Sequence, residues 1–249
     1  MKYILVGDLM RYLAHTKDGK IFVPEEEHEY QSLKDHLTSV SQYAQGFAEA
    51  FGAGEAGALI GRLHDFGKYS ELFQKRIRGA KIKYPHSLEG AKILSGKSDW
   101  IVNLYGLVIA SHHTGLTNLG NVASAGDGSY YDKLLNYQSF PHPAEAILPQ
   151  DEGVAHKKLK PILGNLQASF SIAVYLKMLF SALVDADYTD TEEYISGRKR
   201  EPIAYNIADL TGILEKICPL MMAGQSIILE AIFCKAACSM PKSHKVCSP

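Results

Sequence analysis

The chain has 249 residues, of which 46% are hydrophobic and 21% charged, and its formal net charge at pH 7 is -1. These values are ordinary for a soluble globular protein and allow one large domain, or one domain with a tail. No apolar run approaches the ~18 to 20 residues that a membrane-spanning helix needs. The N-terminus has no signal-peptide cleavage site, so we expect a cytoplasmic protein with no membrane partner.

Basic residues gather in three local groups, although the net charge gives no general attraction to nucleic acid. The groups are Lys75, Arg76, Arg78, Lys81 and Lys83; Lys157, Lys158 and Lys160; and Arg198, Lys199 and Arg200. Such groups permit a groove for a phosphate backbone without showing one, because most charge runs are solvated faces. The four cysteines form no C-x-x-C pair, which argues against a disulfide framework or a zinc finger.

Helical periodicity dominates the chain. Residues 1–7 and 20–23 could pair as a small N-terminal hairpin, but strand signals are otherwise weak. Apolar residues repeat every three or four positions in five segments, which are predicted helices: 32–51, 55–65, 86–94, 100–110 and 161–187. Ser32 is a candidate N-cap, Pro85 could open the third helix, and Gly67 is placed to end the second.

A long segment from Gly115 to about Gln150 is rich in glycine, asparagine, serine and proline. We expect a surface loop or flap there, since loops of this length in a compact domain are often functional or disordered. The predicted fold class is mainly α, a helical bundle whose core can host a site between facing helices.

The dipeptide His64-Asp65 is the strongest chemical signal. Imidazole and carboxylate together suit Mn, Fe, Co, Ni or Zn, and a carboxylate has two oxygens with which it can bridge two metals. Two metals ~3.5 to 4 Å apart can activate a water and stabilise the leaving oxygen of a phosphodiester. The residues that follow complete an H-D-x-G-K pattern, in which Gly67 allows a tight reversal and Lys68 could sit beside a phosphate oxygen.

Further candidate ligands lie on or at the ends of the other predicted helices. His36 is on the inward face of its helix, His86 is at a predicted helix start, and His112-His113 stand at a helix end. Two acids, Asp185 and Asp187, close the last apolar helix, where a buried acid is costly unless it is paired or bound to a metal. Each signal is weak alone, and the acids could simply be exposed.

Taken in order, the pattern H … HD-x-GK … H … HH … D resembles the HD superfamily, and within it the HD nuclease domain of the CRISPR-associated helicase-nuclease of type I systems. The resemblance covers roughly residues 25–215 and includes the phrase Leu183-Val184-Asp185-Ala186-Asp187. It implies an HD-superfamily helical bundle over residues 1–215. Residues 216–249 are then a linker or the start of a following helicase domain.

The resemblance also implies a site of two divalent metal ions. One would be held by His36, His64, Asp65 and Asp187, and the other by Asp65, His86, His112 and His113. Asp187 is preferred over Asp185 because the family's ligand usually follows a small residue. The implied metals are Mn, Ni, Co or Fe, with Mg as a further candidate, and Asp65 and Lys68 are the implied catalytic residues.

The implied reaction is endonucleolytic nicking and then degradation of single-stranded DNA in CRISPR interference. The implied partners are a helicase domain or subunit and the RNA-guided multi-subunit surveillance complex. No P-loop motif G-x-x-x-x-G-K-[ST] is present, so we expect no ATPase activity. Residues 225–231 resemble the segment that precedes the helicase, which leaves open a chain cut before the helicase or a separate nuclease subunit.

Two alternatives remain open. An HD phosphohydrolase acting on nucleotides would keep the fold, but such sites commonly need only H…HD…D and one metal. A non-enzymatic HD-like scaffold would bind partners through its surface, but degenerate scaffolds lose ligands. The extra residues His86, His112 and His113 favour the nuclease.

Overall fold

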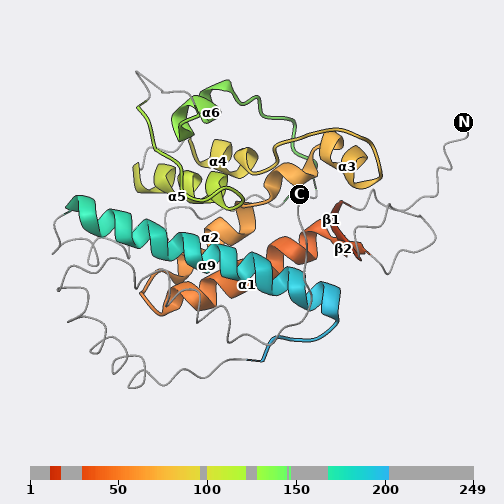
Figure 1. Cartoon of the computed structure of the whole chain (residues 1–249), viewed down its shortest axis with the longest axis horizontal. Helices are drawn as coiled ribbons and strands as arrows, with labels where there is room; N and C mark the ends of the chain where they lie inside the picture. Colours follow the sequence, from red (N-terminus) through yellow and green to blue (C-terminus); the bar gives the residue numbers. More distant parts are fainter. Residues whose placement is uncertain are drawn as a thin grey trace, which may run out of the picture. The chain divides into compact units, whose positions relative to one another are not determined.

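The computed structural model describes residues 12–17, 30–95, 100–121, 128–144, 146 and 168–201. These residues are mainly helical, with one two-stranded antiparallel sheet near the N-terminus (Figure 1). The predicted mainly α class with a small N-terminal hairpin is therefore confirmed. None of the described helices is long and apolar enough to cross a membrane.

The hairpin pairs strand β1, Leu13–Thr16, with strand β2, Tyr30–Ser32. A bulge interrupts the register between the start of β1 and His15. The segments predicted to pair, 1–7 and 20–23, lie outside the described residues. The sequence thus predicts the presence of a hairpin but not the residues that the structure pairs.

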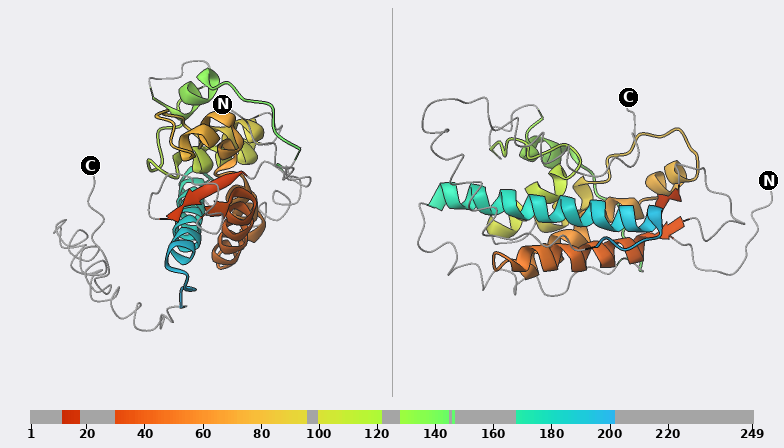
Figure 2. Two further views of the ribbon diagram at one scale, coloured as in Figure 1. Left: turned by 90° about the vertical axis from the view of Figure 1, so that its right-hand side faces the viewer. Right: turned by 60° about the horizontal axis from the view of Figure 1, so that its bottom comes forward.

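Three helices form the centre of the fold: α1, Leu33–Glu49; α2, Gly54–Leu63; and α9, Ala168–Ser196. They pack against one another, and α9 runs alongside α1 (Figures 1 and 2). A Cβ atom at Gly57 or Gly61 of α2 would collide with main-chain oxygens of α1. Glycine at these positions therefore lets the two helices approach closely, and the apolar core extends from α1, α2 and α9 to the helices that follow α2 in the chain.

The starts of the first two helices agree with the prediction to within a residue. Ser32 caps α1, because its hydroxyl accepts the main-chain N–H of Asp35 at 3.0 Å. Helix α2 ends at Leu63, two residues before the predicted end. The chain then forms a short 3-10 helix, η3 (Phe66–Tyr69), and helix α3 (Glu71–Ile77), neither of which the periodicity predicts.

The next two helices pack against each other and contact α2, and the second of them also contacts α9 (Figure 1). Helix α4 spans Leu88–Ser95 and α5 spans Trp100–Ser111. The prediction that Pro85 opens a helix at His86 is wrong, because α4 begins two residues later and His86 precedes it. Helix α5 matches its prediction and is followed by Gly115 with a φ of 81°, whose N–H donates to the Ser111 carbonyl at 2.8 Å.

The segment predicted as a long loop contains a helix, α6, Tyr130–Asn136. Ser129 caps it, and the buried Tyr130 and Leu134 lie four residues apart on its inner face. The loop prediction is wrong for these residues. The two buried apolar side chains allow a short helix to form and to pack on the helix that spans residues 88–95. Residues 122–127, 145 and 147–150 lie outside the described part.

The last described helix extends beyond its predicted end. The apolar period stops near Asp187, yet α9 continues to Ser196. Asp185 and Asp187 are therefore interior residues of a helix, not its terminal acids. Packing divides the chain into residues 1–200 and a second unit, Glu201–Pro249. The predicted domain boundary at 215/216 lies outside the described residues and stays a prediction.

Candidate metal centre

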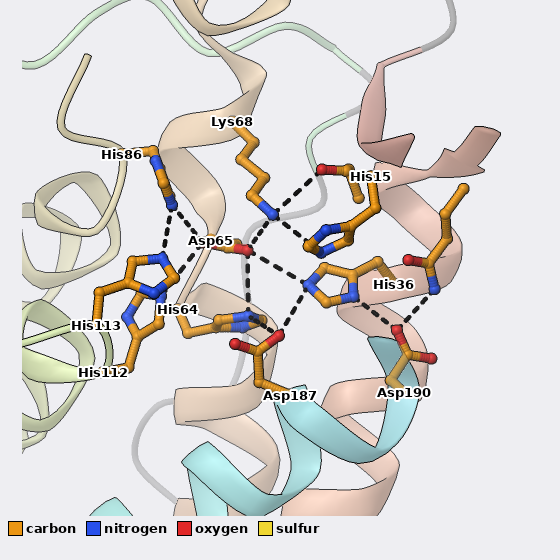
Figure 3. A network of polar contacts seen from close by, with 12 residues as sticks. His15, His36, His64, Asp65, Lys68, His86, His112, His113, Asp187 and Asp190 are labelled. Carbon is orange, nitrogen blue, oxygen red and sulfur yellow. Dashed lines mark hydrogen bonds and ion pairs between the residues drawn. The ribbon is translucent and has the colours of Figure 1, made fainter. Parts of the chain in front are cut away.

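Asp65 lies at the centre of a cluster of histidines and acids (Figure 3). It follows the end of α2 with φ -109° and ψ 22°, so the helix breaks at this residue. The side chain is 1% exposed, and its two oxygens face different groups of residues. Oδ2 faces His36 and His64, whereas Oδ1 faces His86 and His112.

The inner half of the cluster comprises His36 of α1, His64 at the end of α2 and Asp187 of α9. The Nε2 atoms of His36 and His64 lie 3.3 and 3.4 Å from Asp65 Oδ2. Both Nε2 atoms also lie 3.5 Å from Asp187 Oδ1. Both histidines are 0% exposed, so the inner half is enclosed by the three central helices.

The outer half comprises His86, which precedes α4, and His112 and His113, which follow α5. Asp65 Oδ1 lies 3.3 Å from His86 Nε2 and 3.4 Å from His112 Nε2. The Nε2 atoms of His86 and His113 are 2.8 Å apart. His113 is exposed, so this half reaches the surface.

Contacts on the far side of three imidazole rings orient them toward the centre. Nδ1 of His64 lies 2.8 Å from the Gly61 carbonyl, and Nδ1 of His112 lies 2.7 Å from the Ile109 carbonyl. Carbonyls only accept, so each Nδ1 carries the proton and each Nε2 faces the cluster. His36 is held in the same way by Asp190 at 2.6 Å.

Several buried polar atoms in the cluster have no hydrogen-bond partner among the described residues. They are His64 Nε2, Asp65 Oδ1, His86 Nδ1, His112 Nε2 and Asp187 Oδ1. Buried polar atoms left without partners are costly, and four of these five face one another across the cluster (Figure 3). Nitrogen and carboxylate oxygen are the donors that divalent transition metals prefer. The residues present therefore fit a metal, and the cluster could bind one.

Candidate ligand atoms fall into three groups, each with all its atoms within 4.8 Å of one another. One group is Asp65, His86, His112 and His113, which is the predicted outer set. A second group is His15, His36, Asp65 and Asp187, in which His15 stands where His64 was expected. The third group is His64, His112 and Asp187. All seven predicted ligands thus lie in one cluster.

Lys68 is buried, although a lysine after a helix end is commonly a surface residue. Its Nζ lies 2.6 Å from Asp65 Oδ2 and 3.1 Å from His15 Nε2. The amino group therefore neutralises Asp65 on the inner side. Its predicted role beside a substrate phosphate stays a prediction.

Charge is distributed unevenly between the two halves. Burial disfavours ionisation of Asp65, but Lys68 and His64 hold its pKa well below the usual range. Burial alone would lower the pKa of His64, but Asp65 and Asp187 raise it to about 10. The inner half therefore holds a protonated imidazole between two carboxylates at neutral pH.

Two imidazoles of the outer half, those of His86 and His113, are neutral at pH 7. Burial lowers the pKa of His86 to about 3 and that of His113 to about 4. Burial also lowers the pKa of His15 to about 2. These imidazoles are unprotonated at neutral pH, which is the form that binds metals.

The choice between the two acids of α9 is decided by geometry. Asp187 points into the cluster, whereas Asp185 is 53% exposed and pairs with Arg200 at 3.0 Å. The structure therefore places Asp187 with the predicted ligands and leaves Asp185 outside.

Gly67 of the H-D-x-G-K pattern has a role different from the predicted one. It neither ends α2 nor adopts a positive φ, because it lies inside η3. A Cβ atom there would collide with the main-chain carbonyl of His86. Glycine is required because the chain carrying His86 packs directly on it.

Sequence reasoning missed two residues of the cluster. His15 is not among the predicted ligands, yet β1 brings its ring centroid within 4.7 Å of that of His36. Asp190 lies one turn beyond Asp187 and also accepts from Gln31 Nε2 at 2.6 Å. The i, i+3 spacing of the two acids was the available signal, but α9 was expected to end before Asp190.

Comparison with known proteins adds no family assignment, since neither a family model nor a curated protein matches the chain. The function must therefore be argued from the motif order and from the geometry of the cluster.

Proposed function

We propose that the chain is a metal-dependent nuclease that hydrolyses phosphodiester bonds of single-stranded DNA at a site for two divalent metals. The observation that supports this best is that the two carboxylate oxygens of Asp65 face different sets of candidate ligands. One of its oxygens faces the inner half and the other faces the outer half, as a bridging carboxylate requires. Each half offers at least two further nitrogen or oxygen donors.

The donor set favours Mn, Ni, Co or Fe over Mg. Histidine nitrogens are the majority of the ligands, whereas Mg prefers oxygen ligands and retains several waters. When bound, a metal pair supplies an activated water and charge stabilisation for the leaving oxygen of a phosphodiester. We therefore expect activity to depend strongly on which metal is added.

The protein's own residues hold the site in place. Asp190 fixes the His36 ring, and main-chain carbonyls fix His64 and His112. Lys68 offsets the charge of the buried Asp65 carboxylate. Loss of such a supporting contact commonly lowers metal affinity or activity by about 10- to 100-fold.

The outer half distinguishes this proposal from a nucleotide phosphohydrolase. A single-metal site of the H…HD…D type would need only the inner residues, and His86, His112 and His113 would have no reason to meet around Asp65 Oδ1. The complete set also argues against a non-enzymatic scaffold. By the family resemblance, a helicase and an RNA-guided surveillance complex in the cytoplasm belong to the same proposal.

One experiment separates these functions. The protein is stripped of metal, refilled with Mn, Ni, Co, Fe or Mg, and incubated with circular single-stranded DNA and with a panel of nucleotides. We expect cleavage of the circle that is lost in Asp65→Ala. Turnover of nucleotides without cleavage of DNA would indicate a nucleotide phosphohydrolase. Inactivity with every metal would support a non-enzymatic scaffold. Hydrolysis of ATP would contradict the proposal.

A further inference from the structure

A pocket of about 460 Å³ opens beside the metal centre, between β1 and α3. Its lining among the described residues includes His86 and His113 of the outer half, together with His15 and Lys68. These residues surround one side of Asp65 (Figure 3), so the pocket adjoins the centre directly. A molecule in the pocket would lie next to the metals of the proposed site.

The chemistry of the pocket is suited to a phosphate-bearing ring compound. Its described lining has two cations, three histidines and no carboxylate. Phe73 and Ile77 of α3 supply an apolar wall, and exposed Arg76 supplies a guanidinium. An apolar wall with a few polar groups is typical of small-molecule sites, which range over roughly 300–1,000 Å³.

Arg76 differs from its basic neighbours in the same segment. Lys75 pairs with Glu71 at 3.4 Å, and Arg78 donates to the Gln74 side chain at 2.8 Å. Neither Lys75 nor Arg78 lines the pocket, whereas Arg76 does. Within the described part of the chain, the Arg76 guanidinium forms no ion pair, so it can bind an anion with two parallel hydrogen bonds.

We propose that this pocket holds the nucleotide next to the cleaved phosphodiester of a single strand, with Arg76 binding a phosphate oxygen of that strand. The inference rests on the proposed nuclease function and names its substrate subsite. The volume accommodates one nucleotide but not a base pair with both its backbones. The pocket would therefore select single strands over duplexes.

The test compares Arg76→Gln with Lys75→Gln. The second substitution removes the same charge from the preceding position of the same helix. Binding of a fluorescent oligothymidylate to metal-free protein is measured by anisotropy at several salt concentrations. For Arg76→Gln, we expect Kd to rise about tenfold and the salt slope to fall by about 0.7. Lys75→Gln should change neither. Equal effects of the two substitutions, or no binding by the unsubstituted protein, would overturn the proposal.

Two further arms identify the ligand and separate this inference from the nuclease proposal. A duplex of the same length and thymidine monophosphate are used as competitors, and both should compete more weakly than the single strand. If the monophosphate competes as well as the single strand, the pocket binds free nucleotides, and the proposal that it holds part of a DNA strand is overturned. If metal-loaded protein cleaves no phosphodiester, the nuclease proposal fails, yet the binding comparison still decides what the pocket holds.

Discussion

The two halves of the cluster are built in different ways. The inner half takes its residues from α1, α2 and α9, which pack together, and its histidines are fully buried. The outer half takes its residues from the chain before α4 and the chain after α5, and it reaches the surface at His113. The fold therefore encloses the inner half between packed helices and leaves the outer half accessible from the surface.

The halves also differ in protonation. His64 in the inner half is protonated at neutral pH, because its pKa is raised to about 10. His86 and His113 in the outer half are neutral, since their pKa values are lowered to about 3 and about 4. A metal can bind the outer half directly but must displace a proton from the inner half. The enclosed half thus carries the proton, and the accessible half has imidazoles that are free of one.

Loss of Asp65 should affect both halves and have the largest effect. In Asp65→Ala, we expect both metals to be lost and the rate of single-strand cleavage to fall at least about 10³-fold, since several kcal/mol of charge stabilisation disappear. Metal analysis and cleavage kinetics check this. Asp185→Ala is the matched control, because Asp185 pairs with Arg200 outside the cluster. A metal-replete, active Asp65→Ala would remove the bridge from the proposal.

Loss of His113 should affect the outer half alone. In His113→Ala, we expect one metal to be retained and the affinity for the other to fall at least about 10- to 100-fold. Because His113 is exposed, the melting temperature of the metal-free protein should hardly change. Titration with Mn monitored by calorimetry measures both sites. Equal weakening of the two sites would show that the halves are not independent.

Loss of the Asp190 carboxylate should affect the inner half more mildly. Asp190→Asn keeps the shape and an oxygen that can accept from His36 Nδ1, but it removes the charge. We expect about tenfold weaker binding of the inner metal, with the outer metal unaffected. Asp185→Asn on the same helix is the control. An unchanged inner site would mean that packing alone orients His36.

The site was more predictable from the sequence than the boundaries of the elements around it. His64-Asp65 and His112-His113 are adjacent pairs at helix ends, so their grouping depends on few long-range contacts. Their meeting with His36 follows from a helix whose apolar period is strong, and Asp187 lies on α9, which packs against that helix. Six of the seven predicted ligands meet for this reason, whereas His86 precedes α4 and reaches Asp65 through the packing of its main chain on Gly67.

The remaining parts depend on contacts that a single sequence does not reveal. His15 reaches the cluster because β1 pairs with β2, and four strand residues have no distinctive period. Helix α3 is short and largely exposed, so propensity alone could not distinguish it from a loop. The need for glycine at position 67 arises from the packing of the His86 carbonyl, a tertiary contact.

The smallest expected effect is on stability, and it has opposite signs for the two halves. The folded pKa of His64 lies above 6.5, so its stabilisation is complete below pH 6.5 and is lost as the pH rises toward 10. The folded pKa of His86 lies below 6.5, so the unfolded chain gains protons first and stability falls as the pH drops from 6.5 toward 3. Metal-free protein should therefore melt highest near pH 6.5.

Single substitutions assign each side of that profile to its half. Melting temperatures of metal-free protein between pH 4 and pH 9.5 should fall on each side of the maximum, by roughly 2–4 °C for each kcal/mol of lost stability in a chain of this size. His64→Gln should flatten the alkaline side alone, and His86→Gln the acid side alone. If either substitution flattened both sides, the protons of the two halves would be coupled through Asp65, and the halves would titrate as one unit.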